Sequence, residues 1–309
     1  MQIRTLEAFV EIIRQNGFSA AAKILNSTQS TISKSLAQLE RQFATKLVIR
    51  NKGKLQLTAA GEYVYRHAQK ILVEEDAMER EIADLKGLKR GVLKIGLPPI
   101  GSSELFAPVL ARYTSSHPQI DINIVEHGSK RLEEMVYSGE IELAGSLVPV
   151  AHGFDYQSVR NDPVVALMPA SLAAGRKQIT GKELAQYPFV LFASQFALTP
   201  LVIAAFHKQG LEPSVSARSS QIDFLFGLVA AGMGVGFLPR MIAEKRNVKN
   251  VQMVEITDMA IEWHMALIWR SNNHLSYAAR EWLHLASQYH GEPNIETSKI
   301  ITDGKTNKS

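Results

Sequence analysis

The 309-residue sequence predicts a small helical N-terminal domain, a long connecting helix and a larger α/β domain made of two lobes. Three observations predict this fold class. Short helical patterns fill residues 1–58, an apolar heptad spacing runs through residues 59–88, and strand and helix patterns alternate from Val92 onward. Hydrophobic residues make up 46% of the chain, which is enough to build a buried core and excludes global disorder.

Basic residues are concentrated near the N-terminus. The whole chain carries a net charge of +4, but residues 1–70 hold 11 Lys and Arg against four Asp and Glu, a net of +7, which leaves −3 for residues 71–309. Such a split favours a domain that binds a polyanion, joined to a nearly neutral body. Chance clustering of solvated lysines is the alternative, and charge alone does not separate the two.

Three helices and a hairpin are predicted in residues 1–58. Ser19 is the candidate N-cap of the second helix, and Thr28 is that of the third, which runs from Gln29 to about Phe43. Residues 51–54 form the expected hairpin tip. The apolar side of the third helix is predicted to consist of Ile32, Leu36, Leu39 and Phe43.

The second and third helices fit a helix-turn-helix, in which the second helix of the pair enters the major groove of double-stranded DNA. Gln pairs well with adenine, Lys with guanine, and Ser with bases or phosphates, while basic residues on a wing suit phosphate or the minor groove. A generic three-helix packing module is the alternative, but the absence of acidic residues between Glu11 and Glu40 favours DNA. The candidate DNA-binding residues are Gln29, Ser30, Ser33 and Lys34 on the helix and Arg50, Lys52 and Lys54 on the wing.

Residues 59–88 are predicted to form one helix that pairs two copies of the chain. Thr58 can cap it, and a 4-3 apolar spacing, interrupted at Glu75, is typical of a coiled-coil seam. An ordinary amphipathic helix lying on its own domain is the alternative, but the length and the charges on the other faces favour a homodimer. The seam residues are Val64, Ala68, Ile71, Met78, Ile82 and Leu85.

Residues 92–290 have βαβ texture, which predicts a mostly parallel sheet with helices on both faces. The first lobe is expected at about 92–162 and 267–290, and the second at about 163–266. The polar residues 291–309 are expected to be a disordered tail. The expected strands are 92–97, 120–125, 143–148, 164–168, 189–192, 214–217, 235–237 and 265–269, and the expected helices are 105–113, 132–138, 199–209, 221–231 and 278–289.

The sequence carries no sign of catalytic chemistry. It has no cysteine, which excludes disulfide scaffolds, cysteine nucleophiles and thiolate metal sites. The G-x-x-x-x-G-K-[ST], H-E-x-x-H and G-x-S-x-G motifs are missing, and the glycines at 232–236 lack the third glycine of a dinucleotide loop. The histidines are scattered. We therefore expect no cofactor and no metal, and since there is no signal peptide or membrane span, a cytoplasmic protein without a membrane partner.

Residues 5–61 resemble the N-terminal domain of LysR-type transcriptional regulators. The family usually has Ser and Phe where this chain has Thr28 and Val48, and neither departure endangers the fold. The resemblance rests on Leu6, Phe9, Phe18, Ser19, Ala21, Ala22, Leu25, Gln29, Ser33, Leu39, Glu40, Leu47, Arg50, Leu57, Thr58, Ala60 and Gly61.

The resemblance extends to about residue 290 through segments 93–96, 138–144 and 229–239. It implies an effector domain similar to type II periplasmic binding proteins, preceded by a winged helix-turn-helix. The family usually has Asp where this chain has Glu142, which we interpret as structural. The implied function is sequence-specific DNA-binding regulation of transcription that responds to a small-molecule effector. The implied assembly is a homotetramer, with RNA polymerase as a further candidate partner.

By resemblance, the effector contacts come from the loop after the first strand of the effector domain and from a facing loop of the second lobe. A helix N-terminus with free hydroxyls suits a small carboxylate. For the two serines plain helix capping is the alternative, and for the histidine a structural hydrogen bond. The candidate effector-binding residues are Ser102, Ser103, His127, Phe196, Thr199 and Phe237.

Two other classes of protein fit parts of this pattern. A solute-binding protein without a regulatory role would share the two lobes, but the basic N-terminal domain and the missing export signal argue against it. A small-molecule enzyme with a helical dimerisation domain would need a catalytic constellation that the sequence lacks.

Overall fold

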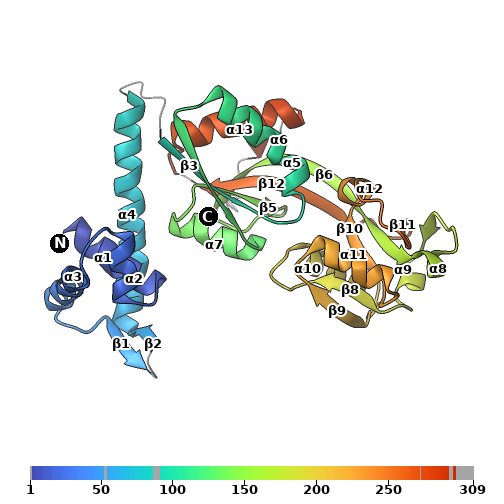
Figure 1. Ribbon diagram of the computed structural model, residues 1–309, viewed down its shortest axis with the longest axis horizontal. Helices are drawn as coiled ribbons and strands as arrows, with labels where there is room; N and C mark the ends of the chain where they lie inside the picture. The colour runs from blue at the N-terminus through green and yellow to red at the C-terminus, as the bar shows by residue number, and fades with distance from the viewer. Residues whose placement is uncertain (1, 52–53, 86–90, 272, 292–294, 297–309) are drawn as a thin grey trace, which may run out of the picture. The chain divides into compact units, whose positions relative to one another are not determined.

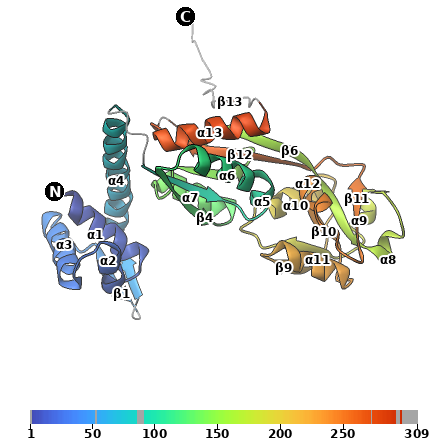
Figure 2. The same cartoon turned by 45° about the horizontal axis from the view of Figure 1, so that its top comes forward.

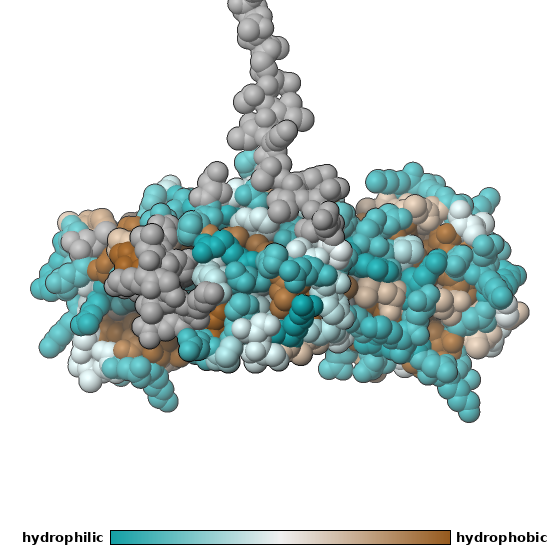
Figure 3. All heavy atoms as spheres, turned by 90° about the horizontal axis from the view of Figure 1, so that it is seen from above, coloured by the Kyte–Doolittle hydropathy of each residue, from teal (hydrophilic) through white to brown (hydrophobic). Residues whose placement is uncertain are grey.

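The computed structural model describes residues 2–51, 54–85, 91–271, 273–291 and 295–296 (Figure 1). It divides into two compact units, residues 1–88 with 138–140, and the rest of the chain. None of the helices in the described ranges is both long enough and apolar enough to cross a membrane. On the face drawn in Figure 3, hydrophilic side chains predominate and the hydrophobic ones form separate patches.

The N-terminal unit is a three-helix domain with a two-stranded wing, followed by a long helix. Ala21, Leu36, Leu39 and Leu47 are buried in one core with residues of the first helix, so the helices and the wing share a single packing centre. The elements are α1 (Ile3–Arg14), α2 (Phe18–Ile24), α3 (Gln29–Gln42), β1 (Val48–Asn51), β2 (Lys54–Leu57) and α4 (Ala59–Leu85).

Two of the three predicted N-caps in this unit are confirmed. The Thr28 hydroxyl accepts from the Thr31 N–H at 3.2 Å, and the Thr58 hydroxyl accepts from the Gly61 N–H at 2.9 Å. The Ser19 prediction is wrong, because α2 already begins at Phe18 and has no side-chain cap. A second correction concerns Phe43, which follows the end of α3 and is 43% exposed instead of completing the apolar side of that helix.

The long helix α4 uses its apolar residues in two ways. Ala68 is buried against the core of its own domain, and Val64 packs against the same core. Ile71, Met78 and Ile82 lie further along the helix and are exposed. The first part of the predicted seam therefore packs within the domain, and the second part leaves apolar side chains on the surface.

The second unit is built on a mixed sheet in the order β4-β3-β5-β12-β6-β11-β7. Strands β3 and β4 pair in parallel, as do β3 and β5, β7 and β11, and β8 and β9. The prediction of a mostly parallel sheet is wrong, because β12 runs antiparallel to β5 and β6, and β10 and β11 run antiparallel to β6. The strands are β3 (Gly91–Leu97), β4 (Ile120–Glu126), β5 (Leu143–Leu147), β6 (Phe154–Pro169), β7 (Gln178–Ile179), β8 (Phe189–Phe192), β9 (Val215–Ser219), β10 (Gly236–Pro239), β11 (Val251–Ile256), β12 (Glu262–Arg270) and β13 (Ile295–Glu296).

Strand β6 changes partners along its length. Residues 154–163 pair with β12, and residues 164–169 pair with β10 and β11. One long strand therefore belongs to both halves of the unit. Within the tail expected to be disordered, Ile295–Glu296 pair with β6, and residues 292–294 and 297–309 lie outside the described residues.

Helices cover both faces of the sheet around β3, β5 and β12, with α6 and α13 on one face and α7 on the other (Figures 1 and 2). Helix α13 is anchored by Glu142, whose carboxylate accepts from the Ser276 N–H at 2.6 Å and from the Ser276 hydroxyl at 2.7 Å. These bonds agree with a structural role for Glu142. The helices are α5 (Ser102–Leu105), α6 (Ala107–Ser116), α7 (Ser129–Ser138), α8 (Ala170–Ala173), α9 (Gly181–Leu184), α10 (Leu198–Lys208), α11 (Ile222–Ala230), α12 (Arg240–Glu244) and α13 (Tyr277–His290).

Candidate functional sites

The N-terminal end of α3 carries a row of exposed polar side chains. Gln29, Ser30, Ser33 and Lys34 are all exposed. The Thr28 cap fixes the first turn, and the Ser19 hydroxyl donates to the Gln29 side-chain oxygen at 3.1 Å. That bond orients the Gln29 amide and leaves its NH2 group to donate elsewhere. These four residues therefore share one accessible end of a rigid helix, as the sequence predicted.

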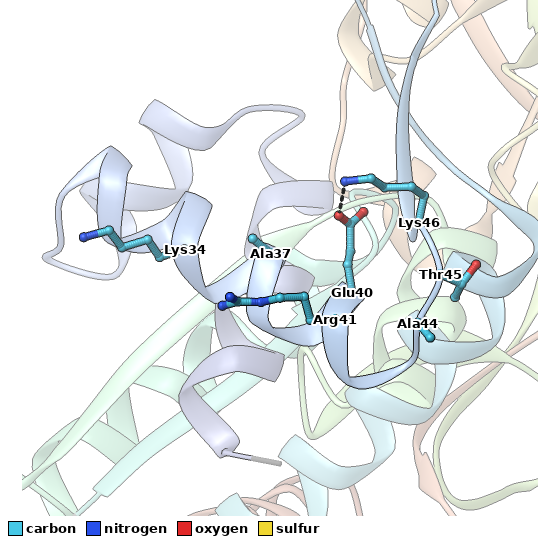
Figure 4. A pocket seen from close by; sticks show the side chains of 7 residues that line it. All are labelled: Lys34, Ala37, Glu40, Arg41, Ala44, Thr45 and Lys46. Carbon is cyan, nitrogen blue, oxygen red and sulfur yellow. Dashed lines mark hydrogen bonds and ion pairs between the residues drawn. The ribbon is translucent and has the colours of Figure 1, made fainter.

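The same face of α3 continues toward its C-terminal end through Ala37 and Arg41. Figure 4 shows the Lys34 and Arg41 side chains extending from the helix that also carries the small Ala37. They line a surface hollow whose far wall is residues 44–46. Arg41 was missed at the sequence level, although its position seven residues after Lys34 places the two on one helix face.

Glu40 lies beside this hollow and is the charged residue that α3 buries. Burial disfavours its charged form, but hydrogen bonds from the Lys46 ammonium and the Leu47 N–H outweigh this and lower the pKa of Glu40. The carboxylate therefore stays ionised and satisfied, and Lys46 is neutralised by it (Figure 4). Lys34 and Arg41 have no ion pair among the described residues, so they are the available cations of the hollow.

The predicted wing residues lie at or beyond the edge of what the structure describes. Arg50 belongs to β1 and Lys54 to β2, which pair antiparallel as the sequence predicted, but their side chains lie outside the described residues. Lys52 lies outside them altogether. A role for these three residues in binding DNA stays a prediction.

The loop after β3 contains Ser102 and Ser103, and the capping prediction for them is wrong. The N-cap position of α5 is Gly101 at φ 93°, so no side chain caps the helix, and α5 ends at Leu105 instead of running on to Tyr113. The Ser102 hydroxyl donates to the Pro98 carbonyl, and the Ser103 hydroxyl donates to the Glu104 carboxylate at 2.7 Å. Ser102 therefore ties the start of α5 to the preceding loop, and Ser103 orients the carboxylate of its neighbour Glu104.

Glu104 on α5 forms an ion pair with Arg246, which follows α12. Its carboxylate lies 3.1 Å from the Arg246 guanidinium, which also lies 3.7 Å from the Asp223 carboxylate at the start of α11. Burial raises the pKa of Glu104, but the Ser103 hydroxyl and Arg246 outweigh burial, so the net shift is downward. No sequence motif predicts this ion pair, because its two residues are 142 positions apart in the chain.

The segment after β4 approaches the segment after β8. His127 is exposed, and Gly128 lies so close to the second segment that a Cβ on it would be 2.2 Å from the Gln195 carbonyl oxygen. Glycine is therefore required for this approach. His127 and Phe196 are two of the predicted effector contacts. Each is next in the chain to a residue of this close approach, Gly128 or Gln195.

The other predicted effector residues have partners inside the fold. Phe196 is buried and packs on Phe192, and the Thr199 hydroxyl donates to the Phe192 carbonyl at 2.8 Å. Phe237 is only 1% exposed and its ring packs against Phe189 and Phe206. The geometry gives Phe237 and Thr199 packing roles, and effector contact by either stays a prediction without support from their surroundings.

Comparison with known proteins identifies both units. Residues 3–62 match the family described as bacterial regulatory helix-turn-helix protein, lysR family, and residues 86–290 match the LysR substrate binding domain. The chain belongs to the LysR family. It is a DNA-binding transcriptional regulator with an effector-binding domain of two α/β lobes.

Several relatives of this LysR-family protein span almost its whole length. It is 32% identical to YwbI of Bacillus subtilis, an uncharacterized HTH-type transcriptional regulator, over 96% of this chain and 99% of that protein. It is 26% identical to the HTH-type transcriptional regulator AlsR of the same organism, over 89% of this chain and 92% of that protein.

Solved structures share the fold. A full-length OxyR variant from Pseudomonas aeruginosa superposes with a TM-score of 0.75 at 20% identity, covering 97% of this chain and 98% of that chain. CbnR complexed with its target DNA superposes with a TM-score of 0.64 at 19% identity, covering 93% of this chain and 99% of that chain.

Proposed function

We propose that this LysR-family protein reads its operator with the exposed face of α3 and changes transcription when a small carboxylate binds between its two lobes. The observation that supports the first part is the row of exposed polar residues at the capped end of α3. For the second part, support comes from the match of residues 86–290 to the LysR substrate binding domain and from the close approach of Gly128 to Gln195. A solute-binding protein without a regulatory role has no support, because the helix-turn-helix match covers residues 3–62.

We further propose that the protein acts in the cytoplasm as a homodimer paired through residues 59–88, and as a homotetramer when two dimers associate. Ile71, Met78 and Ile82 on α4 support the pairing, because they are exposed apolar residues at the predicted seam positions. Contact with RNA polymerase belongs to the same proposal, as the step by which a bound regulator would act on transcription.

Changing Gln29 to alanine is expected to reduce sequence discrimination by roughly tenfold or more, because a bidentate contact to a base contributes about 1–3 kcal/mol of selectivity. Affinity for random DNA should change little. The measurement is competition binding between the selected operator and a random duplex. Gln42→Ala is the matched control, since Gln42 is an exposed glutamine at the other end of α3. An unchanged specificity ratio for Gln29→Ala would remove Gln29 from base recognition.

Changing Ser102 to alanine is expected to weaken effector binding by roughly three- to tenfold and to leave operator affinity unchanged, because it removes the hydroxyl bond to the Pro98 carbonyl that orders this loop. A thermal-shift screen over small carboxylates and aromatic acids would first identify an acid that stabilises the protein. Calorimetry with that acid then compares the variants. Ser115→Ala on α6 is the control, since Ser115 is an exposed helical serine whose hydroxyl bonds only to Ala111 among the interactions described. Equal affinity for the acid would place the effector elsewhere.

A further inference from the structure

Residues Lys46 and Leu47, which connect α3 to the wing, are held on one side by α3. The Oε1 atom of Glu40 accepts from the Leu47 N–H at 3.0 Å, and Oε2 accepts from the Lys46 ammonium at 2.7 Å. Glu40 is itself only 9% exposed, and the Leu47 side chain is fully buried. The bond to Leu47 is a stiff attachment point, because breaking it would leave a buried N–H donor without its partner.

The same two residues are held on the other side by the start of α4. The Thr58 N–H donates to the Leu47 carbonyl at 3.0 Å, and the Thr58 hydroxyl donates to the Lys46 carbonyl at 2.7 Å while capping α4. Gly61 comes so close that a Cβ on it would lie 2.0 Å from the Leu47 carbonyl oxygen. Both helices are therefore fastened to one short piece of backbone.

From this arrangement we infer that Glu40 is a positioning residue for DNA recognition. Through Lys46 and Leu47 it fixes the orientation of α3 relative to α4, and so sets the spacing between half-sites at which a paired protein binds. The inference rests on the proposed pairing through α4. A preferred distance between half-sites exists only when two copies of α3 are held in a fixed relative orientation by that pairing.

The geometry makes the spacing sensitive to this attachment. Gln29 lies 11 residues before Glu40, which is ~17 Å along a helix that rises 1.5 Å per residue. A rotation of α3 by about 12° around its C-terminal end moves Gln29 by ~3.4 Å, which is one base-pair step. The core contacts of α3 hold its middle, and the attachment at residues 46–47 restrains the small change in direction that would shift Gln29 by one base-pair step.

A residue that only stabilised the fold would behave differently. Loss of folded protein lowers the apparent affinity for every operator by the same factor, so the ratio of two affinities is unchanged. A positioning residue changes the ratio between operators that differ only in spacing. That ratio separates the two roles.

The test uses the full chain and inverted repeats of the half-site that the wild type selects from random duplexes, with the central spacing changed one base pair at a time. The readout is the Kd for the next-best spacing divided by the Kd for the best spacing, so a larger ratio means a stronger spacing preference. We expect Glu40→Ala to lower this ratio by about fivefold, because the variant loses the hydrogen bonds to the charged Glu40 carboxylate that restrain α3. Glu40→Gln keeps an acceptor for the Leu47 N–H and should restore most of the ratio.

Lys46→Ala is the matched control, because it removes the ammonium and leaves the bond between Glu40 and the Leu47 N–H in place. Its ratio should equal that of the wild type, because the Lys46 ammonium is 77% exposed and such an ion pair contributes little. If Glu40→Ala does not fold, Glu40→Gln carries the test with an expected drop of about twofold.

Two outcomes count against the inference and are distinguishable. A wild-type protein that prefers one spacing, with a Glu40→Ala variant that keeps the full preference, would overturn the positioning role alone. A wild-type protein without any spacing preference would overturn the paired reading of the operator in the proposed function, and the positioning role with it.

Discussion

Replacing Gly61 by alanine is expected to destabilise the N-terminal domain by about 2 kcal/mol or more and to weaken operator binding. The same change in an exposed helix ordinarily stabilises by ~0.5–1 kcal/mol, because alanine loses less conformational freedom than glycine. The sign is reversed here because the new Cβ would lie 2.0 Å from the Leu47 carbonyl oxygen and 3.2 Å from the Leu57 side chain. The new Cβ has no space, because the Leu47 backbone lies on one side of it and the Leu57 side chain lies on the other.

The measurement is denaturant unfolding of the full chain, followed by circular dichroism, for the wild type and two variants. Gly227→Ala is the matched control, since Gly227 is a helical glycine in α11 whose added Cβ would meet nothing within 4 Å. We expect that variant to gain up to about 1 kcal/mol. A Gly61→Ala variant as stable as the wild type would contradict this prediction. It would mean that residues 46–47 can shift to admit the Cβ without lowering the free energy of unfolding.

The parts of the fold that sequence reasoning predicted well are those determined by neighbours in the chain. Thr28 and Thr58 cap helices that begin one residue later, so the residue type and its position carry the signal. Ser19 has the same residue type and failed, because Phe18 already belongs to α2 and the serine hydroxyl bonds to Gln29 instead. Local chemistry therefore predicts caps only where the helix start is also right.

The first part of strand β6 was not predicted, for a different reason. Residues 164–168 form an uninterrupted apolar run and were predicted as a strand. Residues 154–163 alternate between buried and accessible positions and include Asp155, Gln157 and Arg160, so they carry no comparable run. Their strand character comes from pairing with β12, about 100 residues later in the chain, which no local pattern reports.

Long-range contacts also explain why the candidate DNA-binding residues could be grouped from the sequence more readily than the candidate effector residues. The four candidate residues at the start of α3 occupy one helix end, so their spacing brings them together. The effector candidates lie on segments that meet only through the tertiary fold, such as Gly128 against Gln195 and Glu104 against Arg246. Neither pair shares a motif that a single sequence reveals.

Phe237 provides the sharpest test of the effector assignment, because a core role and a ligand-contact role predict opposite results. Its ring centroid lies 4.7 Å from that of Phe189 and 5.8 Å from that of Phe206, and those two rings also contact each other. Truncating a buried aromatic ring in such a cluster costs about 3–5 kcal/mol. We therefore expect Phe237→Ala to lower the melting temperature of the second unit strongly, whether or not effector is present.

Phe224→Ala is the control for this prediction, since Phe224 lies on α11 and is 57% exposed. Its removal should change the stability by less than about 0.5 kcal/mol. The measurement is thermal unfolding of both variants with and without the acid that stabilises the wild type. A Phe237→Ala protein that melts like the wild type but no longer responds to the acid would assign Phe237 to the effector site. A large loss of stability in the absence of the acid assigns it to the core, because the missing ring contacts are present before any ligand binds.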